Sequence, residues 1–257
     1  MNHGIYTITA GALATEKRFQ IVSNNLANVN TNGFKQQRIT FSSMLPLDKT
    51  ENDYPENIKK GVFNTFPYSD ITKTDFSQGA TKYTGNTFDF AISGKGFFMV
   101  KDANGNIYFT RDGNFKVNQN GYLVTLDGEQ VLDDSQNPIQ LDITNAKFIN
   151  VDENGYIYIN DEVSGKIGVW DLNDYSVLLR FGYNKFKINP KIKPKPTPFL
   201  SKDYKLLQGY LEGSNVNLVK EMVSLIEVQR HYQADQKVIT TIDNQLDNKA
   251  INDVGRI

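Results

Sequence analysis

The stretch SNNLANVNTNGFK, residues 23–35, decides where the first element of the fold ends. It holds five asparagines and reaches Asn32-Gly33 just before Phe34. Asn and Gly accept the left-handed backbone conformation that ends helices, and Asn side chains bond to nearby backbone groups. The stretch therefore predicts the end of a helix, with Phe34 anchoring the chain where it leaves.

Apolar residues upstream of this stretch follow the spacing of a coiled-coil seam. They lie three and four residues apart if Thr15 fills one slot. Gly4 and Gly11 each weaken a helix by about 1 kcal/mol relative to Ala, so this helix needs a partner. The predicted stripe consists of Ile5, Ile8, Ala12, Phe19, Val22 and Leu26.

The C-terminal end of the chain supplies that partner. Residues 218–250 contain neither Gly nor Pro, and a helix of about 30 residues would be about 45 Å long. Asn215 and Asn217 are candidate N-caps, and Glu221 suits the first turn. Apolar positions at spacings of three, four and seven predict a second stripe: Met222, Leu225, Val228, Tyr232, Ile239, Ile242 and Leu246.

The middle of the chain has the pattern of antiparallel β structure. Asn-Gly or Asp-Gly pairs at 104–105, 112–113, 120–121, 127–128 and 154–155 separate short runs rich in Val, Ile, Tyr and Phe. Such pairs tolerate the positive φ values of type I′ hairpin turns. The predicted strands are Phe97–Lys101, Ile107–Arg111, Tyr122–Leu126 and Tyr156–Asn160.

The fold class expected from these patterns is α+β. The terminal helices, within residues 1–45 and 209–257, pair into an inner, coiled-coil-like domain. Residues 46–78, which carry Pro55 and Pro67, form an extended linker. Residues 79–208 form a β-rich outer domain.

Composition argues against catalysis and against several ligand classes. The chain has no cysteine, and its two histidines, His3 and His231, stand in no metal-ligand or triad spacing. A net charge of -1 encodes no attraction to nucleic acid. No run of about 18 apolar residues and no cleaved signal pattern occur. We expect no catalytic, cofactor-binding or metal site, no membrane insertion and no nucleic-acid partner.

Several motifs, in order along the chain, resemble those of the flagellar basal-body rod and hook protein family. Ser23–Lys35 resembles the N-terminal signature of that family, Phe90–Phe98 the entry into its β domain, Phe109–Phe115 and Gly121–Val124 a following hairpin pair, and Leu211–Asn217 the lead into its C-terminal helix. The signature positions are Ser23, Asn24, Asn25, Leu26, Ala27, Asn28, Asn30, Thr31, Gly33 and Phe34.

The resemblance implies a structural protein of the flagellar axle. Its terminal helices would polymerise with other rod and hook subunits and with copies of itself, in a rod that crosses the periplasm and transmits torque from motor to hook. It would be exported by the flagellar type III apparatus without a cleaved signal peptide. Phe41 and Leu45 resemble the short element that docks such substrates to the export gate, although a buried linker anchor explains them equally well.

Several identities remain open at this point. The short segment 46–78 and the segment Val223–Asp243 favour the proximal rod protein over the distal one, whereas the tail at 250–257 departs from the usual end of either. Outside this family, the Tyr and Phe content suits a secreted β-rich module that binds cell-wall glycans. A binding module, however, needs no pair of long terminal helices. An enzyme that cuts peptidoglycan would need a dedicated set of carboxylates.

Overall fold

A computed structural model describes residues 2–40 and 71–254. In that range the chain divides into two units. The helical unit comprises residues 2–26, 37–40, 71–74 and 218–254, and the β unit comprises residues 27–36 and 75–217.

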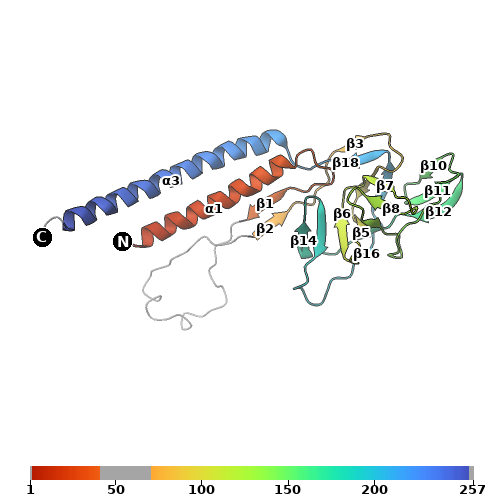
Figure 1. Ribbon diagram of the computed structural model, residues 1–257, viewed down its shortest axis with the longest axis horizontal. Helices are drawn as coiled ribbons and strands as arrows, with labels where there is room; N and C mark the ends of the chain where they lie inside the picture. The colour runs from red at the N-terminus through yellow and green to blue at the C-terminus, as the bar shows by residue number, and fades with distance from the viewer. Residues whose placement is uncertain (1, 41–70, 255–257) are drawn as a thin grey trace. The chain divides into compact units, whose positions relative to one another are not determined.

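The helical unit is built on two long antiparallel helices. Helix α1 spans Asn2–Ala27 and helix α3 spans Leu218–Val254, and they run side by side in Figure 1. A two-stranded antiparallel sheet of β1 (Gln37–Thr40) and β2 (Ile71–Thr74) belongs to the same unit. None of the helices among the described residues is long and apolar enough to cross a membrane.

The β unit is formed by short antiparallel strands. Together with the two helices they confirm the expected α+β class. The strands are β3 Thr81–Tyr83, β4 Phe90–Gly94, β5 Phe97–Lys101, β6 Ile107–Thr110, β7 Phe115–Val117, β8 Leu123–Thr125, β9 Gln130–Val131, β10 Ile149–Val151, β11 Tyr156–Ile159, β12 Glu162–Lys166, β13 Val169–Asp171, β14 Leu178–Phe181, β15 Lys185–Ile188, β16 Phe199–Leu200, β17 Tyr204–Gln208 and β18 Tyr210–Glu212, with a 3-10 helix η2 at Tyr175–Val177.

One large sheet organises this unit. Its strand order is β14-β15-β6-β5-β9-β8-β7, and β13 pairs with both β5 and β16. Strands β10, β11 and β12 form a separate three-stranded sheet, while β17 pairs with β4 and β18 with β3. The four strands predicted from the turn pairs are confirmed as β5, β6, β8 and β11.

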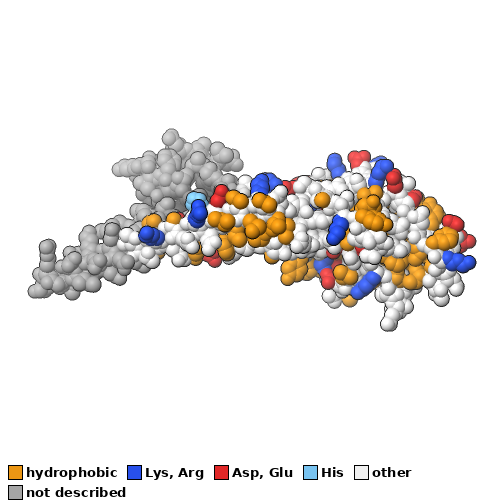
Figure 2. Space-filling view, turned by 90° about the horizontal axis from the view of Figure 1, so that it is seen from above, with side chains coloured by type: hydrophobic (Ala, Val, Ile, Leu, Met, Phe, Trp, Pro, Cys, Tyr) orange, Lys and Arg blue, Asp and Glu red, His pale blue; other side chains and the backbone are white. Residues whose placement is uncertain are grey.

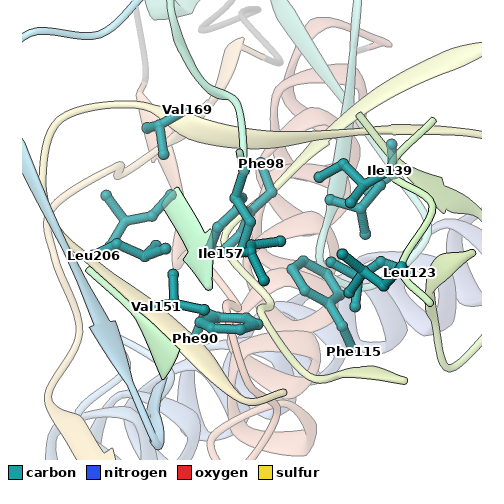
Figure 3. Packing of buried hydrophobic residues seen from close by; sticks show 14 of the residues in the cluster. Phe90, Phe98, Phe115, Leu123, Ile139, Val151, Ile157, Val169 and Leu206 are labelled. Carbon is teal, nitrogen blue, oxygen red and sulfur yellow. The ribbon is translucent and has the colours of Figure 1, made fainter. Parts of the chain in front are cut away.

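Strand β5 is apolar and buried over Phe97–Val100, and its last residue is Lys101. Successive side chains of a strand point to opposite faces, so Phe98 and Val100 enter one hydrophobic cluster while Phe97 and Met99 enter another. Figure 3 shows the first cluster, in which the ring centroids of Phe98 and Phe115 lie 5.1 Å apart. The continuous run FFMV thus marks the centre of the β unit.

The hairpin turns are longer than type I′ turns, which corrects the sequence prediction. The side chains of Asp102, Asn118 and Asp152 each accept hydrogen bonds from the backbone N–H groups two and four residues later, at 2.8–3.0 Å. Positive φ falls on the glycine and not on the preceding asparagine, for example at Gly105 (φ 84°). Type I′ needs positive φ at both central residues, so the leading Asp or Asn side chain organises these loops instead.

The Asp112-Gly113 pair does not form a hairpin. Strands β6 and β7 on either side of it are not neighbours in the sheet. A Cβ at Gly113 would lie 1.9 Å from the carbonyl oxygen of Phe90. The glycine at this position therefore permits a close approach of two backbone segments rather than a tight turn.

Two leucines three residues apart test where the stability of the β unit arises. Leu123 is fully buried, whereas Leu126 is 62% exposed. Leu123→Ala should lower the free energy of unfolding by about 2–5 kcal/mol because it leaves a cavity, and Leu126→Ala by less than about 0.5 kcal/mol. Chemical denaturation of the two variants measures both values, and equal losses would contradict this account of the core.

Candidate functional site

The two helices of the helical unit meet along a seam that contains both polar and apolar side chains. Glu221, Val228 and Asp235 lie seven residues apart on α3. The Nδ2 of Asn25 donates to Oε2 of Glu221 (3.3 Å), and Oγ1 of Thr15 donates to Oδ2 of Asp235 (3.1 Å). Among the helix side chains that the structure describes, residues 11–27 and 218–241, the buried large apolar ones are Ile21, Val22 and Val228.

The predicted apolar stripes are distributed over more than one face. Val22 and Val228 are buried, Ala12, Leu26, Leu225, Tyr232 and Ile239 are half-buried, and Phe19 and Met222 are exposed. Ile5, Ile8, Ile242 and Leu246 lie outside the side chains that the structure describes, and Phe41 and Leu45 lie outside the described residues. The role of all these residues in assembly stays a prediction.

Helix α3 carries an exposed apolar surface on its first turns. We call it the α3 ridge; Figure 2 shows hydrophobic side chains gathered over this part of the helix. Its members recur at spacings of three and four and are 46–70% exposed, which places them along one side of the helix. The ridge consists of Leu218, Val219, Met222, Val223 and Ile226.

Part of the signature stretch is buried: Asn25, Asn28 and residues 33–35 are buried, whereas Asn24, Ala27 and Asn30 are exposed. Asn25 is buried in the helical unit, where its side-chain amide also bonds to both backbone groups of Gln37, at 2.9 Å each. In the β unit, Gly33 has a φ of +66°, and a Cβ there would lie 2.3 Å from the backbone nitrogen of Asp112. Phe34 is fully buried, with the guanidinium of Arg180 4.5 Å from the centre of its ring. Phe34 therefore anchors the chain where α1 ends.

Three of the motifs singled out in the sequence meet in one buried ion cluster. Lys35 ends the signature, Arg111 lies in the motif at 109–115, and Glu212 lies in the motif at 211–217. The Nζ of Lys35 donates to Oε1 of Glu212 at 2.6 Å, and Nη1 of Arg111 donates to Oε2 at 3.2 Å. All three side chains are at most 4% exposed. This ion cluster ties residues 177 positions apart in the chain.

The ion cluster sits among three backbone segments that pair side by side. We call residues 33–36, 75–80 and 211–215 the junction. The N–H of Gly33 donates to the carbonyl oxygen of Glu212 (2.8 Å), the N–H of Asp75 to that of Gln36 (2.8 Å), and the N–H of Gly213 to that of Ala80 (2.9 Å). In the sequence, the segments of the junction lie close to three of the four places at which the chain passes between the two units: after residue 36, before residue 75 and after residue 217.

Burial sets the electrostatics of the junction. Burial lowers the pKa of Lys35, and the charge of Glu212 partly offsets that effect. Burial also lowers the pKa of Arg180 to about 10, and its guanidinium donates to the carbonyl oxygen of Lys35. Arg180 therefore stays cationic at neutral pH.

The sequence analysis did not identify the residues that hold the junction together. It selected Asn215 as a helix cap, but the Asn215 side chain accepts from the N–H of Gln36 (2.7 Å) and donates to the carbonyl oxygens of Asp75 (2.9 Å) and Ser77 (3.1 Å). Glu221 was expected in the first turn of the second helix, where it lies, but its pairing with Asn25 was not foreseen. Lys35, Arg111 and Glu212 each lie in one of the separate motifs, and this was the one sign in the sequence that they belong to a site.

A polar cavity of about 350 Å³ lies beside the signature in the β unit. Asn28 and Thr31 line it together with Asp112, Glu129 and Lys185, and Nζ of Lys185 pairs with Glu129 at 2.6 Å. Among the described residues no group of three or more His, Cys, Asp or Glu side chains is arranged to hold a metal ion.

Asp112 on the wall of this cavity makes stability depend on pH. Burial raises the pKa of its carboxyl to about 6; hydrogen bonds from Asn114 and Asn184 oppose that rise, and the charges of Asp89 and Asp127 add to it. The folded state then binds the proton more tightly than the unfolded state. The ionised carboxylate costs stability above about pH 6, and this cost disappears as the pH falls toward 4.

Asp112→Asn should therefore stabilise the protein at pH 7.5, by up to about 3 kcal/mol from a shift of about two pKa units, and not at pH 4. Urea denaturation at both pH values measures the difference. Asp142→Asn, at an exposed position, is the control and should bring no such gain. A stability difference that is the same at pH 4 and pH 7.5 would contradict the assignment.

Three family models match separate parts of the chain, near its start, in its middle and near its end. Residues 5–35 match the family described as "Flagella basal body rod protein", residues 91–159 "Flagellar hook protein FlgE/F/G D1 domain", and residues 207–252 "Flagellar basal body rod FlgEFG protein C-terminal".

Individual relatives align over 90% or more of their own lengths. The flagellar basal-body rod protein FlgF of Mesorhizobium japonicum is 34% identical over 233 residues, 91% of this chain and 90% of that protein. FlgF of Caulobacter vibrioides is 33% identical and covers 100% of both chains. The rod protein FlgG of Buchnera aphidicola from Schizaphis graminum is 32% identical over 92% of this chain and 94% of its own.

Proposed function

This chain belongs to the family of flagellar basal-body rod proteins, and we propose that it forms the proximal part of the rod and polymerises there through its terminal helices. The family is structural and not enzymatic. Membership also argues against a secreted glycan-binding module. What remains to be assigned is the position along the rod and the surface through which the subunit assembles.

The proximal position is supported by the match along the full length of Caulobacter FlgF and by the short segment 46–78. The distal position is the second candidate because FlgG relatives of Buchnera reach 32–33% identity over 92% or more of this chain. The two identities differ in the stage at which a rod lacking the protein would stop.

The observation that carries assembly through the helices is the imbalance of their apolar side chains. In residues 11–27 and 218–241, three large apolar side chains are buried, whereas eight are exposed. An exposed apolar surface of this kind marks an interaction site. The exposed ones are the five of the α3 ridge together with Leu13, Phe19 and Val238.

The energetics of the α3 ridge suit a polymer better than a tight pair. Full burial of one such side chain stabilises a complex by about 1.5–3 kcal/mol. The five ridge side chains are 46–70% exposed, so covering all five contributes about half of the full amount, about 4–8 kcal/mol, to the free energy of association. Association costs about 4–15 kcal/mol in lost freedom of motion. One such contact is marginal, and contacts with several neighbours in a helical array are stable. Contacts that do not close generate an open filament.

A rod built in this way would transmit torque from motor to hook across the periplasm. Other rod and hook subunits would be its neighbours, and the flagellar type III apparatus would deliver it. Phe41 and Leu45 stay the predicted element for docking to the export gate.

Deleting the gene identifies the position of the protein. Electron microscopy of basal bodies from the deletion strain should show rods that stop before the proximal section is complete. Expression of the protein from a plasmid should restore full-length rods. Rods that retain a complete proximal section and lack only the distal section would assign the protein to the distal position instead.

A charge on the α3 ridge tests the assembly surface. Ile226→Lys should leave the stability of the isolated subunit within about 0.5 kcal/mol, because the side chain is exposed, and should abolish motility and rod completion. Gln229→Lys adds the same charge at another exposed position of α3 and should preserve both. Normal rods with Ile226→Lys would remove the ridge from the assembly surface.

A further inference from the structure

The junction is held mainly by Glu212 and Asn215, which lie three residues apart. Oε1 of Glu212 accepts from Nζ of Lys35 and from the N–H of Gly79 (2.9 Å), so one carboxylate binds the segments at 33–36 and 75–80 together. Asn215 bonds to the same two segments through Gln36 and Asp75. Both of the other segments therefore bond to the C-terminal one, and they also bond to each other through Gln36 and Asp75.

The charges strengthen the attachment to the C-terminal segment. Glu212 is the carboxylate that pairs with both Lys35 and Arg111, and all three side chains are buried. Removing one partner of a buried ion pair leaves an uncompensated buried charge. This shifts the equilibrium between the closed and the open junction toward the open form by roughly 100-fold to a few thousand-fold. If residues 211–215 move away, Lys35 cannot stay buried where it is.

The backbones of the junction are also packed without room for adjustment. A Cβ at Gly79 would lie 2.1 Å from the carbonyl oxygen of Gly213. Nζ of Lys35 donates a second bond to the carbonyl oxygen of Ser77, at 2.7 Å. Main chain lies directly on main chain, so one segment cannot shift without breaking its hydrogen bonds to the others.

We propose that the junction opens and closes as one cooperative unit, separately from the β core, and that Glu212 is the positioning residue that makes docking of the N-terminal signature conditional on the C-terminal segment. A chain whose residues 211–215 have not docked cannot hold residues 33–36 in place. The segment 33–36, which follows α1 in the sequence, and the segment 211–215, which precedes α3, therefore dock together or not at all. This inference concerns the single chain and does not rest on the proposed position in the rod.

Native-state hydrogen exchange on the full-length wild-type protein, in low concentrations of guanidinium, tests cooperativity directly. The N–H groups of Gly33, Gln36, Asp75 and Gly213 should exchange with one shared opening free energy and one shared denaturant dependence. The N–H of Leu132, which bonds to the Met99 carbonyl oxygen in the core, should be more protected. Different opening free energies for Gly33 and Gly213 would overturn the proposal.

Glu212→Gln tests the role of the carboxylate. Exchange at Gly33 and Gln36 should accelerate about 100-fold or more, although the acceptors of these N–H groups, the Glu212 backbone oxygen and the Asn215 side chain, are left in place. The N–H of Leu132 should keep its protection. Acceleration confined to Gly79, the direct partner of the carboxylate, would show a local contact and overturn the proposal.

Two further variants control this test. Glu153→Gln removes an exposed carboxylate that pairs with Lys205 at 2.8 Å and should leave exchange in the junction unchanged. Lys35→Met combined with Glu212→Gln should accelerate exchange by less than the product of the two single effects, because both disrupt one interaction. Multiplicative effects would contradict the coupling, and this comparison remains valid if the single variants are strongly destabilised.

Discussion

The buried carboxylate of Glu212 is the interaction on which the arrangement of this chain depends. It lies in the segment that leads into the last helix, pairs with Lys35 at the end of the N-terminal signature and with Arg111 just after β6, and accepts from the N–H of Gly79. A buried charge is stable only where its partners and hydrogen bonds are complete. The segments of the junction are therefore held together by a set of complementary charges and not by apolar packing alone.

The two units differ in where their apolar side chains lie. The β unit buries nearly continuous apolar strands such as β5 between two clusters and supplies its own stability. The helical unit pairs its helices through polar contacts such as Thr15 with Asp235 and leaves the α3 ridge exposed. The β unit therefore buries its apolar side chains in a core, whereas the helical unit leaves apolar side chains exposed on α3. This distribution suits a protein whose family forms rods.

Much of the fold could be predicted because local patterns carry it. The turn pairs marked β5, β6, β8 and β11, since a glycine that must take positive φ is visible in the sequence. The turn type was wrong because the side chain of the residue that begins each loop, such as Asp102, competes for the backbone N–H groups. Asp112-Gly113 was misinterpreted because a glycine required for close packing against Phe90 looks the same as a glycine required for a turn.

The long helices at both ends, the β-rich middle and the family could be predicted from the sequence, because periodicity, turn residues and ordered motifs are local properties of the chain. The burial of Lys35, the bonds of Asn215 to two other segments, and the division of the apolar stripes between a seam and an exposed ridge became visible in the folded chain alone. A lysine in a sequence gives no sign of burial, since its partner Glu212 is 177 residues away and meets it only when the intervening strands are in place.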